Sequence, residues 1–284
     1  MRRFCVLHRP CCSPFPRFAR VPVVLLPENL DQFLLVFGLG AARTIPLVWS
    51  VPAFGGPTLP AQVRLVLGIA LSALCFPILS AHPPVGGDLF WMLLAGREVV
   101  VGAAMGFVCS CVFRAAEAAG QLTDVLRGAN LAEAISPVGA GRSSPLGILM
   151  LLLFVVVFHR IGGVGMIAVA LARSYDAIPL IAPLPFGKTT HAMAILAVVA
   201  SGKLIESAIG LCAPAVVALL LADIVLGALG RSAPQIPLYF VGMPLKALLG
   251  VGAVLIGLAT LDVTMQQTFQ GFLSLFEAAA RLGR

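Results

Sequence analysis

Long apolar runs separated by short Pro-rich and Gly-rich segments form the hydrophobicity pattern of this chain. A membrane-crossing helix needs about 20 apolar residues, so the pattern predicts an all-α fold of polytopic hydrophobic helical hairpins with about six long, partly broken helices. The expected helices, with interruptions at Arg43 and Pro46 in the first and at HRIGGVG in the fourth, cover residues 30–49, 63–79, 88–127, 146–179, 190–211, 214–231 and 245–261. These helices predict one hydrophobic domain over residues 29–270, preceded by an unstructured leader of residues 1–28 and followed by an amphipathic tail of residues 271–284.

A polar stripe lies where the surrounding sequence is membrane-like. In FRAAEAAGQLTDVLRGANLAEAISP, residues 113–137, polar side chains recur at helical spacing and apolar residues cover the rest of the helix. Isolated charges in hydrocarbon are costly, so such a stripe is expected to face protein or water and to mark an interior surface. The polar stripe consists of Arg114, Glu117, Gln121, Asp124 and Arg127.

The segment GANLAEAISPVGAGRSSP, residues 128–145, follows the stripe and breaks the helical pattern. Its glycines, prolines and small polar residues predict a mobile loop. A plain surface linker is the alternative interpretation. The residues of interest in this loop are Gly128, Asn130, Glu133, Ser136, Pro137, Gly139, Gly141, Arg142 and Pro145.

Charged residues in the other apolar runs are candidates for pairing between helices. Arg97 and Glu98 are adjacent and are expected to point to different faces, so each is expected to need a partner on another helix. Lys203 and Glu206 stand three residues apart and are expected to pair on one helix face. Asp223 is expected to be buried within its apolar run.

Small residues and prolines add candidates for close contacts and turns. Gly102 and Gly106 form a GxxxG motif, which permits two helices to approach closely in a membrane. Pro234 and Gln235 lie in a Pro-punctuated loop and are expected to fix a hairpin turn.

The composition indicates that these helices belong to an integral membrane protein or to a subunit of one. Hydrophobic residues make up 60% of the chain, charged residues 11%, and the mean hydropathy is +1.02. The net charge of +7 comes from scattered Lys and Arg with no basic run interleaved with aromatics, which argues against a nucleic-acid partner. Arginines cluster near the N-terminus, and the positive-inside rule then places that end in the cytoplasm.

Motifs of enzyme chemistry are missing from the sequence. It contains no HExxH, GxSxG or P-loop pattern, and its seven cysteines include no CxxC pair. We therefore expect no catalytic residue, no metal and no cofactor. The alternative to a passive subunit is a secondary transporter or channel subunit, because such proteins hold substrates with broken helices and midplane charges.

Five stretches together resemble a known family. They are VPAFGGPTLPAQVRLVLGIALSALCFP, which contains Arg64, then GREVVVGAAMGF, AAEAAGQLTDVLRGANLAEAISP, SYDAIPL and LGALGRSAPQIPLYFVGMPLK. In this order they resemble the export-apparatus T proteins of bacterial type III secretion, which are similar to the R protein of the flagellar export gate. The resemblance covers roughly residues 30–276, and the injectisome is favoured over the flagellum.

The resemblance implies a noncatalytic subunit of the export gate, multi-pass in the bacterial inner membrane at the core of the secretion basal body. The implied partners are the gate proteins R and S, the switch protein U, the large export protein V and membrane lipid, with effector and needle proteins as passing substrates. It also implies that Glu117, Gln121, Asp124 and Arg127 line or brace a conduit, and that residues 128–145 form the plug that closes it.

Overall fold

The described part of the chain is a bundle of helices. In the computed structural model it comprises residues 30–55, 59–79, 88–129, 144–179, 186–232, 235, 240, 242–252, 266, 269–271 and 274. The elements are α1 (Leu30–Ser50), η1 (Pro52–Phe54), α2 (Ala61–Leu79), α3 (Asp88–Arg127), α5 (Pro145–Arg160), α6 (Gly163–Ala177) and α7 (Phe186–Ser232). All regular structure in these residues is helical, which confirms the predicted all-α class. The predicted leader and most of the predicted tail lie outside the described residues.

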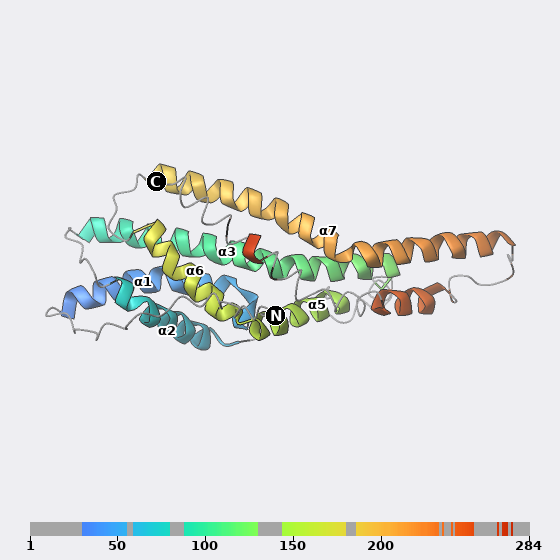
Figure 1. Cartoon of the computed structure of the whole chain (residues 1–284), viewed down its shortest axis with the longest axis horizontal. Coiled ribbons are helices and arrows are strands. Elements are labelled where there is room, and N and C mark those ends of the chain that lie inside the picture. Colours follow the sequence, from blue (N-terminus) through green and yellow to red (C-terminus); the bar gives the residue numbers. More distant parts are fainter. Residues whose placement is uncertain are drawn as a thin grey trace, which may run out of the picture.

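Helix α3 is the central element of the bundle. It packs against α7 on one side and against α1 and α5 on the other, while α2 packs on α1 (Figure 1). The 40 residues of α3 and the 47 residues of α7 make them the longest elements, and α7 extends past the end of α3 (Figure 1). The middle of α3 is therefore surrounded by protein, whereas much of α7 is not.

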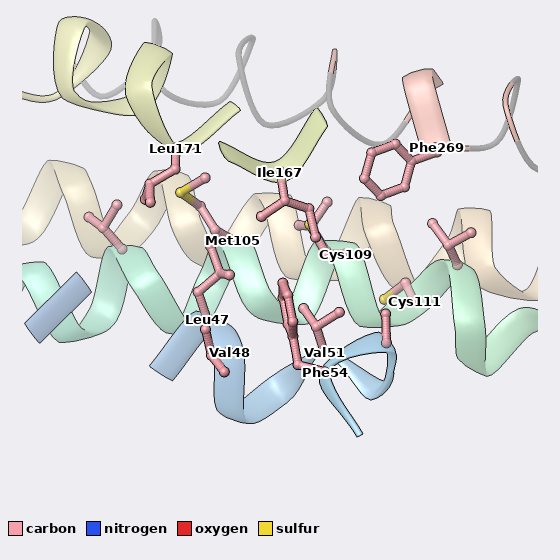
Figure 2. Close-up of a cluster of buried hydrophobic side chains, with 14 of the residues drawn as sticks. Leu47, Val48, Val51, Phe54, Met105, Cys109, Cys111, Ile167, Leu171 and Phe269 are labelled. Atoms are coloured by element: carbon pink, nitrogen blue, oxygen red, sulfur yellow. The ribbon is translucent and has the colours of Figure 1, made fainter. Parts of the chain in front are cut away.

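The hydrophobic core lies where α1, α3 and α6 meet. Figure 2 shows side chains of the α1 and η1 segment pointing towards α3, with α6 on the other side of α3. Its labelled buried members are Leu47, Val48, Val51, Phe54, Met105, Cys109, Cys111, Ile167, Leu171 and Phe269. Close packing of these side chains holds α1 and α6 on α3.

Two prolines that were expected to interrupt helices lie inside them. Pro46 lies four residues before the end of α1, and Pro214 lies inside α7. The predicted interruption of α1 and the predicted start of a new helix at Pro214 are therefore wrong. A proline removes one backbone hydrogen bond, and the rest of a long apolar helix can still be held by packing against its neighbours. Both helices pack along α3, which supplies that support.

The predicted break at HRIGGVG is confirmed. Helix α5 ends at Arg160 and α6 begins at Gly163, and the two are bent by 73°. Gly162 has a φ of 74°, in the left-handed region where an L side chain is disfavoured. The glycine therefore allows the chain to fold α6 back over the core.

Several helices have the length and hydropathy of membrane spans. Three of the described helices qualify, in α1, α3 and α7, or four when the bent α5 and α6 pair is taken as one span. The span in α3 is 61% buried inside the chain, but that in α7 is only 22% buried. The outer side of α7 is thus available to lipid or to another protein.

Candidate functional site

One buried carboxylate holds both ends of the segment that joins α3 to α5. The side chain of Asp124, in the last turn of α3, is fully buried. Its Oδ2 accepts hydrogen bonds from the Ser144 hydroxyl and from the Leu146 backbone N–H, the latter at 2.9 Å. The Arg127 Nε lies 2.6 Å from Oδ1, as an ion pair without the alignment of a hydrogen bond. We call Asp124, Arg127, Ser144 and Leu146 the loop-end cluster.

The local sequence explains why these groups meet. Gly128, with a φ of 81°, ends α3, and the next backbone N–H, of Ala129, donates to the Asp124 carbonyl at 3.1 Å. On the other side, Ser144 is the N-cap of α5 and its hydroxyl accepts from the Gly147 N–H at 3.0 Å, with Pro145 as the first helical residue. A helix end and a helix start are therefore tied to one side chain.

The polar stripe divides into an exposed and a buried part. Arg114 is 58% exposed and forms an ion pair of 2.7 Å with Glu117, whose side chain is 20% exposed. Gln121 is exposed and donates from Nε2 to Glu117 at 3.4 Å. Asp124 and Arg127 belong to the buried loop-end cluster. Within this chain the stripe is thus interior only at its C-terminal end.

Of the predicted loop, the structure describes the two ends. Gly128 and Pro145 terminate α3 and begin α5, as stated above. The remaining candidates lie outside the described residues, namely Asn130, Glu133, Ser136, Pro137, Gly139, Gly141 and Arg142.

A second polar cluster, which we call the arginine cluster, is buried between α1, α3 and α6. Arg43 and Glu98 are fully buried, and the Arg43 Nε donates to Glu98 at 2.5 Å. Arg43 also donates to the Ser174 hydroxyl at 3.0 Å and to the Ile178 carbonyl at 3.1 Å, and its guanidinium lies 4.2 Å from the Tyr175 ring centroid. Each of its three nitrogens thus donates to a protein group, and Arg43 links α1 to α3 and to the α6 segment.

Arg97 belongs to the same cluster. It donates to Glu98 Oε1 at 2.8 Å and to the Pro179 carbonyl at 3.0 Å. The expectation that Arg97 and Glu98 point apart is wrong, because the long arginine side chain reaches back to its neighbour. Glu98 also has the predicted partner on another helix, Arg43. Sequence reasoning missed Arg43 as a site residue, although a lone arginine in an apolar helix calls for a buried acid elsewhere.

Glycines permit the close helix crossings around α3. A Cβ at Gly102 would overlap the Arg43 carbonyl, and one at Gly106 would lie 2.9 Å from the Leu47 Cα. The α3 and α5 crossing has the same character, because a Cβ at Gly120 would lie 2.7 Å from the Gly147 Cα. The GxxxG glycines thus lie against α1, and the second pair escaped the sequence analysis because its members are on different helices.

The remaining pairing candidates are exposed. Among the described residues no ion pair joins Lys203 to Glu206, and both side chains lie on the surface of α7. Asp223 is 44% exposed and forms an ion pair with Lys246, so its predicted burial is wrong. The reason is that this end of α7 extends past the bundle, where few neighbours cover it (Figure 1).

Turn, metal and thiol candidates add little to the site. Gln235 is an exposed turn residue, whereas Pro234 lies outside the described residues. In the part of the chain that the structure describes, no group of three His, Cys, Asp or Glu side chains converges as a metal site. The cysteines of that part are free and buried, at Cys75, Cys109, Cys111 and Cys212.

Asp124→Leu is expected to release the start of α5. The variant removes the acceptor of the Ser144 hydroxyl and of the Leu146 N–H and leaves Arg127 without its ion pair, at a cost of about 2 kcal/mol. Amide hydrogen exchange of Leu146 and Gly147 is expected to accelerate, and secretion to fall. Val125→Leu, at the next position and exposed, is the control and should not change this exchange. Equal exchange in both variants would contradict the role of the cluster.

Comparison with known proteins covers nearly the whole bundle. The model of the bacterial export proteins, family 1, matches residues 34–272. The chain is 28% identical over 247 residues to the surface presentation of antigens protein SpaR of Shigella flexneri, across 86% of this chain and 93% of that protein. It is 29% identical over 238 residues to the secretion system apparatus protein SsaT of Salmonella typhimurium, across 81% of this chain and 90% of that protein.

A flagellar protein is similar over the same region. The flagellar biosynthetic protein FliR of Bacillus subtilis is 26% identical over 243 residues, across 85% of this chain and 92% of that protein. Relatives from both kinds of machine confirm the predicted resemblance to the type III secretion T proteins and the flagellar R protein. Together with the apolar helices, they make this chain a membrane protein and a subunit of an export apparatus. The chain belongs to the bacterial export proteins, family 1.

Proposed function

We propose that this chain is a noncatalytic subunit of the inner-membrane export gate of a bacterial type III secretion system, where residues 128–145 form the plug of the conduit. The observation that carries the proposal is the loop-end cluster. Asp124 ties the last turn of α3 to the first turn of α5, so the segment between them starts and ends at one fixed point. A plug needs such a base, because it must yield to a substrate without releasing the helices that hold it.

The polar stripe supports a conduit next to the plug. Arg114, Glu117 and Gln121 form a hydrogen-bonded row on the exposed side of α3, in direct line with the loop-end cluster. A polar row on an apolar helix suits a surface that contacts water and an unfolded chain. In this proposal the row lines the passage and the loop-end cluster anchors its closure.

The exposed apolar surface supports assembly with other gate proteins. Most of the span in α7 is not buried by this chain, and its mean hydropathy is 2.5. In the proposed function this surface is covered by lipid and by the gate proteins R and S, with the proteins U and V nearby in the apparatus. Effector and needle proteins are the substrates that pass.

The transporter alternative gains no support from the buried charges. Glu98 is a buried carboxylate in the N-terminal third of α3, of the kind that could bind an ion in a transporter, and it is bonded by two arginines. The arginines in turn are occupied by Ser174 and by backbone carbonyls. These contacts favour a structural role for the cluster.

Shortening the plug is expected to make the assembled gate leak. Deletion of residues 134–141, which leaves the loop-end cluster intact, should raise the passage of a small fluorescent dye across vesicles that contain the purified gate complex. A matched insertion of the same length of Gly and Ser after position 235, in an exposed turn, should leave the leakage at the level of the unmodified gate. Unchanged leakage of an intact complex with the shortened loop would contradict the plug.

A further inference from the structure

The outer face of α7 combines a long apolar row with two charges. Six of its apolar side chains are between 44% and 74% exposed, namely Ile195, Val198, Ile205, Ile209, Val217 and Ile224. Lys203 and Glu206 lie on the surface in the same stretch. Neither has an ion-pair partner among the described residues, in contrast to Asp223 on the same helix, which is paired with Lys246.

Lipid alone does not account for this face. At 1.5 Å per residue, the row from Ile195 to Ile224 is about 44 Å long. A hydrocarbon core of about 30 Å, crossed at the largest common tilt of about 40°, holds about 39 Å of helix. Water is an equally poor environment for the row, because contiguous exposed apolar surface of this size marks an interaction site. Part of the row therefore lies beyond the hydrocarbon core, where another protein can cover it.

The two charges indicate the chemistry of that protein. A carboxylate that becomes buried at an interface without a counter-ion is strongly destabilising, and so is an ammonium. Glu206 lies one helical turn from Ile209 and one from Gly202, where an added Cβ would meet no atom of this chain within 4 Å, so a partner can approach it closely. The covering surface must therefore bring one charge of each sign.

We propose that Lys203 and Glu206 form a docking pair for an apolar helix of another export-apparatus subunit, which presents a basic side chain to Glu206 and an acidic side chain to Lys203. This inference rests on the proposed function, in which the chain assembles with other gate proteins. It gives the pair a role that the fold of the chain does not require, since both side chains are exposed in it.

Photocrosslinking in the intact secretion system tests the occupant of this face. A photoreactive phenylalanine derivative is placed at Ile209, beside Glu206, and adducts are identified by mass spectrometry. The expected adduct joins this chain to a different apparatus protein. An adduct with a second copy of this chain, or with lipid alone, would overturn the proposal.

Charge variants in the same system test the pair itself. Glu206→Lys is expected to lower the yield of that adduct and of the purified gate complex about tenfold or more, because like charges then face each other. Lys203→Glu combined with Glu206→Lys keeps the net charge of the chain and is expected not to restore the yield. Asp223→Asn is the matched control, since that carboxylate has its partner within the chain.

The outcomes separate the docking pair from the proposed function. If Glu206→Lys leaves the adduct and the complex yield unchanged, the proposed docking role of the pair is wrong, while the proposed gate function stands. Full restoration of the yield by the double variant would also overturn the proposed docking role, because it would show that only the net charge of the chain matters. If the unmodified chain yields no complex with any apparatus protein, the proposed function fails and the inference fails with it.

Discussion

Glu98→Gln is expected to destabilise the folded chain by about 3–5 kcal/mol, because it leaves two buried arginines without a counter-ion. Arg43 and Arg97 both donate to Glu98, and at most 3% of any of the three side chains is exposed. Glutamine preserves the volume and offers one acceptor oxygen, so the loss reports the charge and not a cavity. Denaturant unfolding of the purified chain in mild detergent measures the change, since typical stabilities are only about 5–15 kcal/mol.

The same change at Glu117 is the control for this result. Glu117 pairs with Arg114, which is more than half exposed, and pairs of this kind contribute about 0–1 kcal/mol. Glu117→Gln should therefore shift the unfolding midpoint only slightly. Similar shifts for the two variants would show that the arginine cluster does not hold α1 and α6 on α3.

Gly102→Ala is expected to cost about 3 kcal/mol, at the upper end of the range for overpacking. The added Cβ would overlap the Arg43 carbonyl, which belongs to the backbone of α1 and cannot rotate away. The α1 and α3 crossing must then widen, and Arg43 moves away from Glu98. Unfolding in detergent gives the stability, and the accessibility to a thiol reagent of Cys109, a buried side chain two turns further along α3, reports the widening.

Gly96→Ala is the matched control in the same helix. Gly96 is exposed, and a Cβ there meets no atom within 4 Å, so only the helix propensity changes. Alanine is favoured over glycine by about 1 kcal/mol in a helix interior, and this variant should gain stability. The two alanines are thus expected to act in opposite directions. A loss of stability at both positions would remove the close-approach argument for Gly102.

Apolar patterning predicted the helices well and their continuity poorly. The start of α3 at Asp88 and the break before Gly163 followed from local sequence, through a capping aspartate after a Pro-rich and Gly-rich loop and through a pair of glycines. Pro46 and Pro214 misled the prediction, because a proline removes a local hydrogen bond but packing against α3 outweighs that loss. A short stretch of sequence does not show which helices will pack against it.

For the polar groups of the site, the sequence revealed the charged residues but not their partners. Asp124 stood out as a charge in an apolar helix, yet its partners Ser144 and Leu146 follow about 20 residues later, across a loop whose path the sequence does not define. Arg43 has partners still further away in the chain. The exposed face of α7 was misread as a paired one, because i to i+3 spacing permits an ion pair without requiring it.

The arginine cluster also sets an order for biosynthesis. Arg43 is translated 55 residues before Glu98 and 131 residues before Ser174. At a synthesis rate of about 5–20 residues per second, the Glu98 carboxylate is made several seconds after Arg43, and the Ser174 hydroxyl later still. Helix α1 therefore completes its contacts only after α6 has been synthesised. A nascent chain whose synthesis stops before Glu98 carries Arg43 without a counter-ion.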